Sequence, residues 1–399
     1  MKRVALVVPG FEEGGGVPAV ALFLARIMRD TGRYEPEFIS PVMNSSDPLG
    51  VRLLSPRSWL RGVRSERATC HGEPYTRIGA CGSELEFQRL RPRAALTELL
   101  SGFDLVQIVA GGPAWGWLAR DVSVPTAMQV ATLAAVERRA VLGEGSVPQR
   151  AWRSLMTRIT TWLEARGLDG VDAVFVENQW MDDHLREQIG SERVIFAPPG
   201  VDTDRFRPSE SAQEPPGPGV VLCVGRLADP RKRVDLLFEA YAGLCARLED
   251  PPRLLLAGGS APPEASWARA RELGVLERIE FRADVPGDEL VELYRNASVF
   301  ALASDEEGLG IVIVEAMACG LPVVTTDCGG PSTSVLDGET GILVPRNDPE
   351  AMASALHSLF TDPAQRARMA RSARARATEV FSLKAAGQHF IDWYDRTLA

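Results

Sequence analysis

One strand-to-helix unit of the sequence reads Val299-Phe300-Ala301-Leu302-Ala303-Ser304-Asp305-Glu306-Glu307-Gly308-Leu309-Gly310-Ile311-Val312-Ile313-Val314-Glu315. The apolar run 299–303 predicts a buried strand. A glycine-framed turn then carries Glu307, and an apolar run that predicts a helix begins near Gly310 or Ile311. The N–H groups of a first helical turn suit an anion or a ring of hydroxyls, and Glu315 follows about one turn later. We expect both carboxylates to hold one ligand; the alternative is an exposed loop acid beside an ordinary helix Glu.

The same alternation of short apolar runs and helix-like stretches extends in both directions. The C-terminal half predicts further strands at 220–224, 253–257, 279–281, 322–326 and 341–344. The N-terminal half predicts strands at 4–8, 105–109, 173–176 and 194–196, with helix-like stretches at 19–30 and 155–166. Parallel strands joined by helices produce this pattern. The sequence therefore predicts the α/β class, with two doubly wound, Rossmann-like domains.

A Pro- and Gly-rich segment, residues 198–219, breaks both periodicities and separates the halves. We take 1–197 as the N-terminal domain, 198–219 as a linker and 220–380 as the C-terminal domain. Open sheets bind ligands at the carboxyl ends of their strands, so two such domains facing each other should form a cleft. The last segment, 381–399, has Phe390, Trp393 and Tyr394 at helical spacing. It is expected to form a packing helix that crosses back to the N-terminal domain.

Length and composition allow a large core, because the chain has 399 residues of which 45% are apolar. No apolar run approaches the length of a membrane span, and the run 4–9 is too short for a signal peptide. We therefore expect a cytoplasmic protein. The six cysteines and four histidines are scattered, which favours structural thiols over a metal site.

Charge is distributed unevenly along the chain. Residues 1–197 hold 23 basic and 23 acidic side chains, whereas residues 198–399 hold 21 basic and 30 acidic ones and so carry the whole net charge of −9. An acidic half argues against general nucleic-acid binding. Residues 52–93 contain nine Arg and four acids. This stretch is either a solvated basic surface or a face for a phosphorylated acceptor or for anionic lipid, as in peripheral contact with the inner face of a membrane.

A basic pair follows the first strand of the C-terminal half, in the stretch Gly225-Arg226-Leu227-Ala228-Asp229-Pro230-Arg231-Lys232-Arg233. Arg226 stands at the strand end and Lys232 beside the start of the next helix, so both can converge on a diphosphate. The alternative is a run of surface cations, since Arg231, Lys232 and Arg233 cannot all point inward.

Together these motifs resemble the retaining glycosyltransferases of the large family-4 type, which have the GT-B fold. The resemblance covers nearly the whole chain. Its matching elements are, in order, Gly14-Gly15-Gly16, residues 199–206, Gly225-Arg226 with Lys232, Glu307 to Glu315, and Gly329-Gly330-Pro331 with residues 337–341. The resemblance implies an enzyme that moves a sugar from a nucleoside-diphosphate sugar to an acceptor hydroxyl with retention of configuration. It implies neither a metal nor another cofactor.

The resemblance also implies a role for each matching position in the C-terminal half. Arg226 and Lys232, beside Gly225, would neutralise the leaving diphosphate, so that catalysis would be electrostatic. Glu315 would bind the ribose. Glu307 would bind hydroxyls of the donor sugar, with help from the backbone of Gly308, Leu309, Gly310 and Ile311. Arg226, Lys232 and Glu307 are thus the predicted catalytic residues, and no nucleophile is assigned.

In the N-terminal half the resemblance leaves more open. Gly15 and Gly16 would let the backbone approach the donor phosphates or the acceptor closely. The family often has a His on a strand-end segment that reads 125–132 here, and this chain has none, so that role is either unfilled or taken by Gln129 or Thr132. Trp115 either shapes an acceptor pocket or packs as a core Trp beside a tight turn. The acceptor itself, whether a small molecule, a glycan or a lipid-linked molecule, is not fixed by the sequence.

Two other stretches of the C-terminal half have ambiguous roles. Arg282 falls where the family usually has an apolar residue near the base, and it is either a donor contact or a surface Arg. Asp202-Thr203-Asp204 formally fits the Asp-x-Asp metal motif of other transferases. It belongs to the linker match without partner carboxylates, so we expect no metal.

Three rival functions are compatible with parts of the pattern. An NAD-dependent oxidoreductase would use residues 14–19, which formally fit G-x-G-x-x-A, but Pro18 interrupts the motif and no ribose-binding acid follows the second strand. A non-catalytic protein that binds nucleotide sugars would not need the complete set of Glu307, Glu315, Arg226 and Lys232. A phosphorylase on the same fold would need a cofactor-binding lysine, which is not evident; a sugar-nucleotide epimerase is the remaining alternative.

Overall fold

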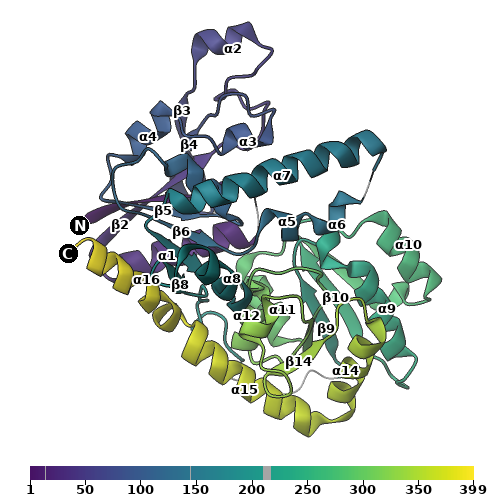
Figure 1. Ribbon diagram of the computed structural model, residues 1–399. Helices are drawn as coiled ribbons and strands as arrows, with labels where there is room; N and C mark the ends of the chain where they lie inside the picture. The colour runs from purple at the N-terminus through teal and green to yellow at the C-terminus, as the bar shows by residue number, and fades with distance from the viewer. Residues whose placement is uncertain (14, 144, 210–216) are drawn as a thin grey trace. The chain divides into compact units, whose positions relative to one another are not determined.

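The computed structural model describes residues 1–13, 15–143, 145–209 and 217–399. It divides into two compact units (Figure 1). Unit 1 comprises Met1–Pro198 with Gly387–Ala399, and unit 2 comprises Pro199–Ala386. The division at Pro198 lies one residue from the domain end expected at 197. The Gly14 of the glycine motif and residues 210–216 of the expected linker lie outside the described residues.

Unit 1 contains an eight-stranded sheet with the order β3-β4-β2-β1-β5-β6-β7-β8. All neighbouring strands are parallel except β3 and β4, which form an antiparallel edge. The strands are β1 (Lys2–Val7), β2 (Tyr34–Pro41), β3 (Ser65–Cys70), β4 (Glu73–Ile78), β5 (Leu105–Val109), β6 (Thr126–Val130), β7 (Ala173–Val176) and β8 (Val194–Phe196). The four predicted N-terminal strands are present as β1, β5, β7 and β8, and β2, β3, β4 and β6 lie outside the predicted ranges.

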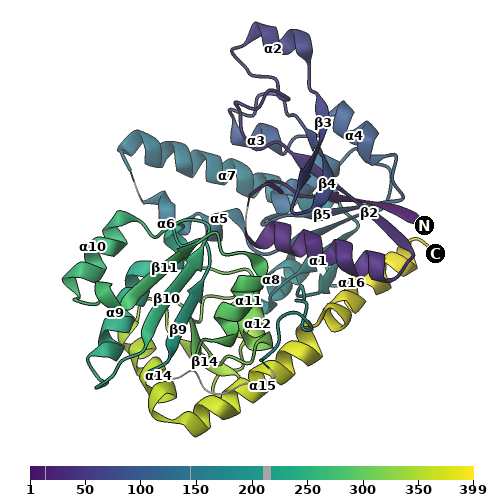
Figure 2. The same ribbon diagram turned by 180° about the vertical axis from the view of Figure 1, so that it is seen from behind.

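The helices of unit 1 vary widely in length. Figure 2 shows α1 lying across the sheet, where it contacts β2 and β5. The expected helix at 155–166 is the second half of the long helix α7, which begins earlier because Ser146 N donates to Gln149 Oε1 at 2.8 Å in a capping box. The helices are α1 (Gly16–Asp30), α2 (Pro56–Arg61), α3 (Glu86–Arg89), α4 (Ala94–Leu100), η1 (Pro113–Ala119), α5 (Ala134–Glu137), α6 (Arg139–Leu142), α7 (Val147–Asp169) and α8 (Gln179–Ile189).

Unit 2 contains a fully parallel six-stranded sheet with the order β11-β10-β9-β12-β13-β14. This is the doubly wound order 3-2-1-4-5-6, in which the winding direction reverses between β9 and β12. The strands are β9 (Val220–Val224), β10 (Arg253–Gly258), β11 (Ile279–Ala283), β12 (Val299–Leu302), β13 (Val323–Thr326) and β14 (Gly341–Val344). The predicted second Rossmann-like domain is confirmed.

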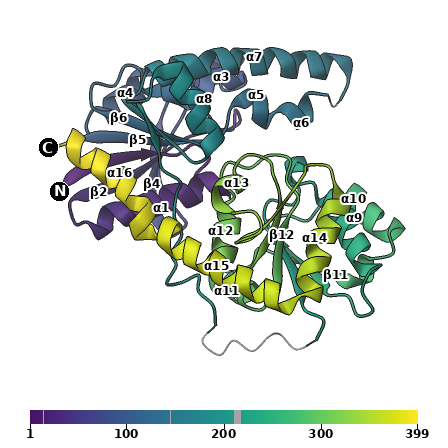
Figure 3. The same cartoon turned by 60° about the horizontal axis from the view of Figure 1, so that its bottom comes forward.

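Helices cover both faces of the unit 2 sheet. Helices α9, α10 and α14 form one packed group, and α12, α13 and α15 form another on the opposite side of β12 (Figure 3). The helices are η2 (Pro230–Lys232), α9 (Val234–Cys245), α10 (Glu264–Glu272), η3 (Leu276–Arg278), α11 (Gly287–Arg295), α12 (Ile311–Ala318), α13 (Pro331–Ser334), α14 (Pro349–Thr361), α15 (Pro363–Phe381) and α16 (Leu383–Thr397).

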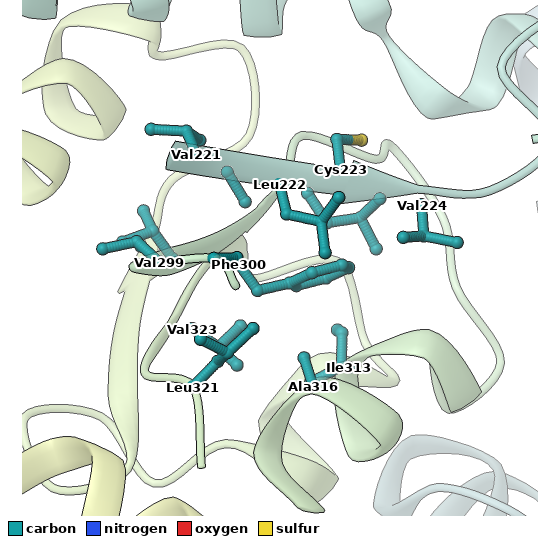
Figure 4. Close-up of a cluster of buried hydrophobic side chains, with 14 of the residues drawn as sticks. Val221, Leu222, Cys223, Val224, Val299, Phe300, Ile313, Ala316, Leu321 and Val323 are labelled. Atoms are coloured by element: carbon teal, nitrogen blue, oxygen red, sulfur yellow. The ribbon is translucent and has the colours of Figure 1, made fainter. Parts of the chain in front are cut away.

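The core of unit 2 fixes the position of α12. Figure 4 shows Leu222 of β9 and Phe300 of β12 on the side of the sheet that faces Ile313 and Ala316 of α12. All four side chains are fully buried. Burying a large apolar side chain of this kind stabilises a fold by about 1.5–3 kcal/mol. The apolar run after Gly310 therefore holds the start of α12 rigidly against the ends of β9 and β12.

The C-terminal segment packs as the aromatic spacing predicts. Helix α16 begins in unit 2, whereas its residues from Gly387 onward belong to unit 1. There Phe390 is fully buried with its ring 4.5 Å from that of Phe175, and Tyr394 OH donates to Gln107 Oε1 at 2.9 Å. A Cβ at Gly387 would come within 2.9 Å of Ile27, so only glycine permits this close approach of α16 to α1.

The six cysteines, at 70, 81, 223, 245, 319 and 328, are free thiols. Within the described ranges no group of three or more His, Cys, Asp or Glu side chains is arranged to hold a metal ion. The absence of a metal requirement remains a prediction. In the same residues no helix combines the length and the apolar character that crossing a bilayer requires.

Candidate functional site

The candidate site lies in unit 2, at the carboxyl ends of β9 and β12. These two strands are neighbours in the sheet, and the winding reverses between them. Loops that leave such strands in opposite directions open a crevice at the switch point, where doubly wound sheets bind ligands. Arg226 follows β9 by two residues and Glu307 follows β12 by five. The two predicted motifs therefore meet at one edge of the sheet.

Lys232 and Glu307 form a short ion pair at this switch point. Lys232 Nζ lies 2.5 Å from Glu307 Oε1, and the two side chains are only 12% and 10% exposed. Low exposure strengthens such a pair, because little water screens it. The loop before Lys232 is held by Asp229, whose carboxylate accepts a hydrogen bond from Arg231 N at the start of η2.

Each of the three cations at 231–233 pairs with a different acid of the loop at 305–307. Arg231 Nη1 lies 2.9 Å from Glu306 Oε2, and Arg233 Nη1 lies 3.3 Å from Asp305 Oδ1. Lys232 lies between these two arginines in sequence and forms its ion pair with Glu307. All three cations thus pair with acids of the 305–307 loop, and Lys232 is the one that reaches Glu307. That only some of them face a ligand stays a prediction.

Glu307 is held in place from a second direction. Ser304 Oγ donates to the same atom, Glu307 Oε1, at 2.6 Å. Ser304 is fully buried, and its carbonyl accepts a hydrogen bond from Thr326 Oγ1 at the end of β13. In the described part of the chain no donor reaches Glu307 Oε2. One carboxylate oxygen is thus fixed by the protein, while the other remains able to accept a hydrogen bond from a ligand.

Glycines shape the loop between Glu307 and α12. Gly330 N donates to Glu307 O at 3.1 Å, and a Cβ on Gly330 would lie 2.3 Å from Gly308 O. No side chain fits there, so the two loops can touch only because residue 330 is glycine. Gly310 has a φ of 77°, which favours glycine, and it starts α12. The side chain of Leu309 is buried, so Leu309 can contribute to a ligand only through its backbone.

Glu315 lies four residues, or about one helical turn, after Ile311, the first residue of α12. Its Oε2 accepts a hydrogen bond from Tyr294 OH at 2.8 Å, and Tyr294 is fully buried. Burial raises the pKa of Glu315 to about 7, against the opposing effects of Tyr294 and Arg205. The side chain is half-buried, so Glu315 has one face in the protein and one that a ligand can reach.

Arg226 and Gly225 lie directly beyond β9. The Arg226 side chain is 55% exposed, and its nearest acid is Asp229 at 3.5 Å, which is already engaged with Arg231. Gly225 N donates to Ala257 O at 3.0 Å, which extends the pairing with β10. Arg226 is therefore only loosely held, and its guanidinium has the freedom to turn toward an anion beside Lys232.

Arg282 lies away from this cluster. It stands on the edge strand β11, separated from β9 by β10. Arg282 Nε donates to Glu280 Oε1 at 2.7 Å, and its Nη1 lies 3.4 Å from Glu289 Oε1. These contacts match the interpretation as a surface Arg, and the donor-contact interpretation stays an untested prediction.

The predicted residues of unit 1 lie on three elements: the start of α1, the strand β6 and the helix η1. Gly15 is the N-cap of α1 with a φ of 118°, a conformation that favours glycine, whereas a Cβ on Gly16 would meet nothing within 4 Å. Gln129 of β6 is fully buried, and its Nε2 donates to Glu177 Oε1 at 3.2 Å. Trp115 is half-buried in η1 and packs against the core. The last contact matches the interpretation as a core Trp, and the acceptor roles of Gln129 and Trp115 remain predictions.

Two residues of the site were not found by sequence reasoning. Ser304 follows β12 by two residues, and a polar residue at a strand end was a signal that could have marked it. Tyr294 lies on the apolar face of α11, where it is indistinguishable in sequence from a core residue. Its partnership with Glu315 depends on a contact across 21 residues.

The chain is similar to known proteins in both sequence and structure. Residues 204–376 match the family described as "Glycosyl transferases group 1". The chain is 37% identical over 286 residues to a D-inositol 3-phosphate glycosyltransferase of Acidothermus cellulolyticus, covering 65% of this chain and 61% of that protein. It is 35% identical over 300 residues to the protein of the same name from Nocardia farcinica, covering 71% and 64%. The chain thus spans less than two thirds of the length of these curated relatives.

Solved structures resemble the fold over nearly the full length of the chain. A sucrose-phosphate synthase from Thermosynechococcus elongatus superimposes with a TM-score of 0.73 at 21% identity, covering 99% of both chains. Anabaena HepE in complex with UDP and glucose gives a TM-score of 0.70 at 18% identity, covering 99% of this chain and 100% of the other. At these identities the likeness concerns the fold alone. The domain at 204–376 is thus similar to the group 1 glycosyl transferases, and the chain has the two Rossmann-like units of the GT-B fold, as the motif resemblance predicted.

Proposed function

We propose that the protein is a retaining, metal-independent glycosyltransferase that moves a sugar from a nucleoside-diphosphate sugar to an acceptor hydroxyl. The observation that carries the proposal is the Lys232–Glu307 pair at the switch point of unit 2, within the family domain. A cation and a carboxylate at 2.5 Å offer the two chemistries that such a donor needs: a charge for phosphate and an acceptor for sugar hydroxyls.

The donor would lie across the ends of β9 and β12. Its diphosphate would draw Lys232 away from Glu307 and take the loosely held Arg226 as a second cation. The first N–H groups of α12 add a favourable dipole at the same edge. Glu307 would then accept hydrogen bonds from the sugar through Oε2, while Ser304 keeps Oε1 in place.

Glu315 would bind the ribose on the far side of the diphosphate. A carboxylate can accept a hydrogen bond from each of two neighbouring hydroxyls, and Tyr294 keeps it oriented. Arg282 would contact the donor only if a ligand displaces its pairs with Glu280 and Glu289.

Transfer would proceed by stabilising the leaving group. As the glycosidic bond lengthens, negative charge grows on the diphosphate, and Arg226 and Lys232 oppose it with two positive charges. These cations would do the work for which other transferases use a metal. The acceptor hydroxyl enters on the face from which the diphosphate leaves, which gives retention. No protein nucleophile is needed, because Glu307 faces sugar hydroxyls.

The acceptor is proposed from the relatives rather than from the site. The named relatives act on D-inositol 3-phosphate, so a phosphorylated cyclic polyol is the first acceptor to test. Another relative, from Mycolicibacterium smegmatis, is named a GDP-mannose-dependent phosphatidylinositol monomannoside mannosyltransferase, at 39% identity over 209 residues, 49% of this chain and 54% of that protein. Lipid-linked and glycan acceptors therefore stay in the proposal, as does a cytoplasmic location with peripheral contact to a membrane. Gly15, Gly16, Gln129 and Trp115 are the residues proposed for unit 1.

The donor is tested first by binding. Thermal-shift measurements with UDP, GDP, ADP and dTDP, and then with their sugars, identify the base, since a ligand at 100 times its Kd stabilises by about 2.7 kcal/mol. Lys232→Ala should weaken binding of the selected diphosphate by about 10- to 100-fold, the loss expected for one charged hydrogen bond. Lys384→Ala on α16 removes the same charge at an exposed position and serves as the matched control. Equal affinity of Lys232→Ala and wild type contradicts the leaving-group assignment.

Transfer is tested with the donor so identified and with D-inositol 3-phosphate. Glu307→Gln should lower kcat by about 100-fold while leaving diphosphate binding within a few fold, because it removes a charge that acts on the sugar. Activity should persist in EDTA. Donor binding without product over a wide acceptor panel would instead support a non-catalytic sugar-nucleotide-binding protein.

A further inference from the structure

The segment 52–61, here called the α2 loop, exposes an apolar surface to water. Leu54 is 96% exposed, Leu60 is 91% exposed and Trp59 is 53% exposed. Figures 1 and 2 both show α2 projecting beyond β3 and away from the rest of unit 1. Scattered single apolar residues are common on protein surfaces, but three large ones within seven residues form a patch.

The side chains of α2 are arranged opposite to those of an ordinary surface helix. Its single buried residue is Ser58, which is 1% exposed, while Trp59 and Leu60 face outward. A surface helix normally buries its apolar side chains and exposes its polar ones. Here the polar hydroxyl points inward and the apolar groups point out, which suits an apolar surrounding outside the protein.

Hydrogen bonds hold the α2 loop in this outward arrangement. Ser58 Oγ donates to Ser55 O at 2.6 Å and accepts from Arg52 N at 2.9 Å. Trp59 Nε1 donates to Leu53 O at 3.3 Å, which satisfies the indole N–H within the loop. Because these bonds close the loop on itself, the apolar side chains cannot turn inward without breaking them. The exposure of Leu54 and Leu60 is therefore built into the fold.

Positive charge surrounds the apolar patch. Residues 52–67 contain five Arg and one acid, Glu66, which is paired with Arg77. Arg57 and Arg61 are exposed on either side of Trp59 and Leu60. Apolar side chains beside arginines are the composition of segments that lie in the headgroup region of a bilayer, where Trp and Arg both favour the interface. A phosphate alone would leave the leucines in water.

We infer that the α2 loop docks unit 1 on an anionic lipid surface, with Leu54, Trp59 and Leu60 inserted and Arg57 and Arg61 at the headgroups. This narrows the peripheral contact proposed above from residues 52–93 to one loop. The biological role of this docking rests on the proposed function. The lipid binding itself does not, because it requires neither a sugar donor nor sugar transfer.

Vesicle sedimentation tests the inference with the full chain. Wild type should bind vesicles that contain about one third anionic lipid, and binding should weaken with salt and be at least tenfold weaker on neutral vesicles. The double variant Leu54→Ser/Leu60→Ser should lower the partition coefficient by about 100-fold, at about tenfold for each lost leucine. Arg57→Glu/Arg61→Glu should lower it by at least tenfold. The matched controls Val380→Ser and Arg371→Glu, at exposed positions of α15, should bind like wild type.

A second measurement does not depend on the double variants. Brominated lipids should quench part of the tryptophan fluorescence of wild type, and Trp59→Phe should remove that part. Unchanged quenching in Trp59→Phe, wild-type partition of the leucine variant, or equal binding to neutral vesicles overturns the inference. A dimer in solution that dissociates in Leu54→Ser/Leu60→Ser also overturns it, since a second copy would then cover the patch. Nucleotide thermal shifts on the same samples separate a failure of lipid docking from a failure of the proposed function.

Discussion

Glu315 allows the sharpest prediction, because its buried environment opposes its negative charge. Burial raises the pKa of this carboxyl to about 7 from an ordinary value of 4.5. The hydrogen bond from Tyr294 OH offsets part of that effect. The folded protein therefore holds a proton on Glu315 that the unfolded chain releases between these two pH values.

The sign and size of the effect follow from linkage. Between pH 4.5 and 7 the folded state binds about one proton more than the unfolded state, so the unfolding free energy falls as pH rises. Below pH 4.5 both states are protonated at Glu315, and the full stability is present. At about 1.4 kcal/mol per unit of pKa, the loss by pH 7 is on the order of 3 kcal/mol.

Glu315→Gln removes the titration and keeps an oxygen that can accept from Tyr294. The difference in unfolding free energy between Glu315→Gln and wild type should be small near pH 4.5. It should grow to about 3 kcal/mol in favour of the variant by pH 7.5. Urea unfolding read by pulsed hydrogen exchange on peptides from α12 follows unit 2 separately from unit 1, which matters because two units need not unfold in one transition.

Tyr294→Phe is the companion variant. It removes the one donor that lowers the pKa of Glu315, so the pH-dependent loss should extend to higher pH than in wild type. If the stability difference between Glu315→Gln and wild type stays the same from pH 4.5 to 7.5, Glu315 is ordinary in its titration and the argument from burial is refuted.

Three further predictions follow from the same geometry. Diphosphate affinity should rise through about pH 7, because ionised Glu315 accepts ribose hydroxyls better than its protonated form; calorimetry at pH 6 and 8 that gives equal values for wild type contradicts this. Gly330→Ala should cost about 3 kcal/mol and weaken donor binding, since the new Cβ would overlap Gly308 O at 2.3 Å. Its control Gly143→Ala, with open space around the Cβ and no proposed role in the site, should be neutral or slightly stabilising; a neutral Gly330→Ala would show that the contact between the two loops does not require glycine. Arg282→Ala should leave diphosphate affinity within about threefold of wild type, since Arg282 is paired two strands away from Lys232; a tenfold loss would show that it turns to the donor.

The strands of unit 2 were predictable because they are buried on both faces. Parallel strands under two helix layers consist of short apolar runs, and turn residues bound them. The predicted 220–224 and 341–344 agree with β9 and β14, and 279–281 misses only the last two residues of β11. The missed residues there are Arg282 and Ala283 at the sheet edge, where an exposed side chain no longer marks a strand.

The hairpin β3–β4 was not predictable by the same reasoning. Its sequence, residues 65–78, is rich in Arg, Glu and Thr, and most of β3 is exposed. β3 is the antiparallel edge strand, and in β4 only Tyr75 and Ile78 are buried, so no continuous apolar run forms. The Arg-rich stretch was therefore interpreted only as a basic surface, and its two strands were not predicted.

The site was predicted by position, whereas its pairings depend on the fold. Glu307 and Lys232 each stand at a strand end that a sheet of this order brings together. Arg231 pairs with Glu306, and Arg233 pairs with Asp305. These pairs follow from how two loops, about 75 residues apart in sequence, lie against each other. Spacing within either motif carries no information about that alignment. Tyr294 was missed for the same reason.

The pairing of Lys232 with Glu307 also bears on which ligand the site prefers. Each neutralises the other at 2.5 Å, and the two side chains are only 12% and 10% exposed to water. A nucleoside diphosphate alone would draw Lys232 to its phosphates and leave Glu307 with Ser304 as its remaining partner among the described residues. Removing the cation from a poorly hydrated carboxylate costs free energy. A donor that carries a sugar offsets this cost, because its hydroxyls reach the carboxylate that the lysine leaves. On the proposed function, the ion pair therefore makes the site bind the intact sugar donor more tightly than the product nucleoside diphosphate. This difference in affinity helps the product nucleotide to dissociate after the sugar has been transferred.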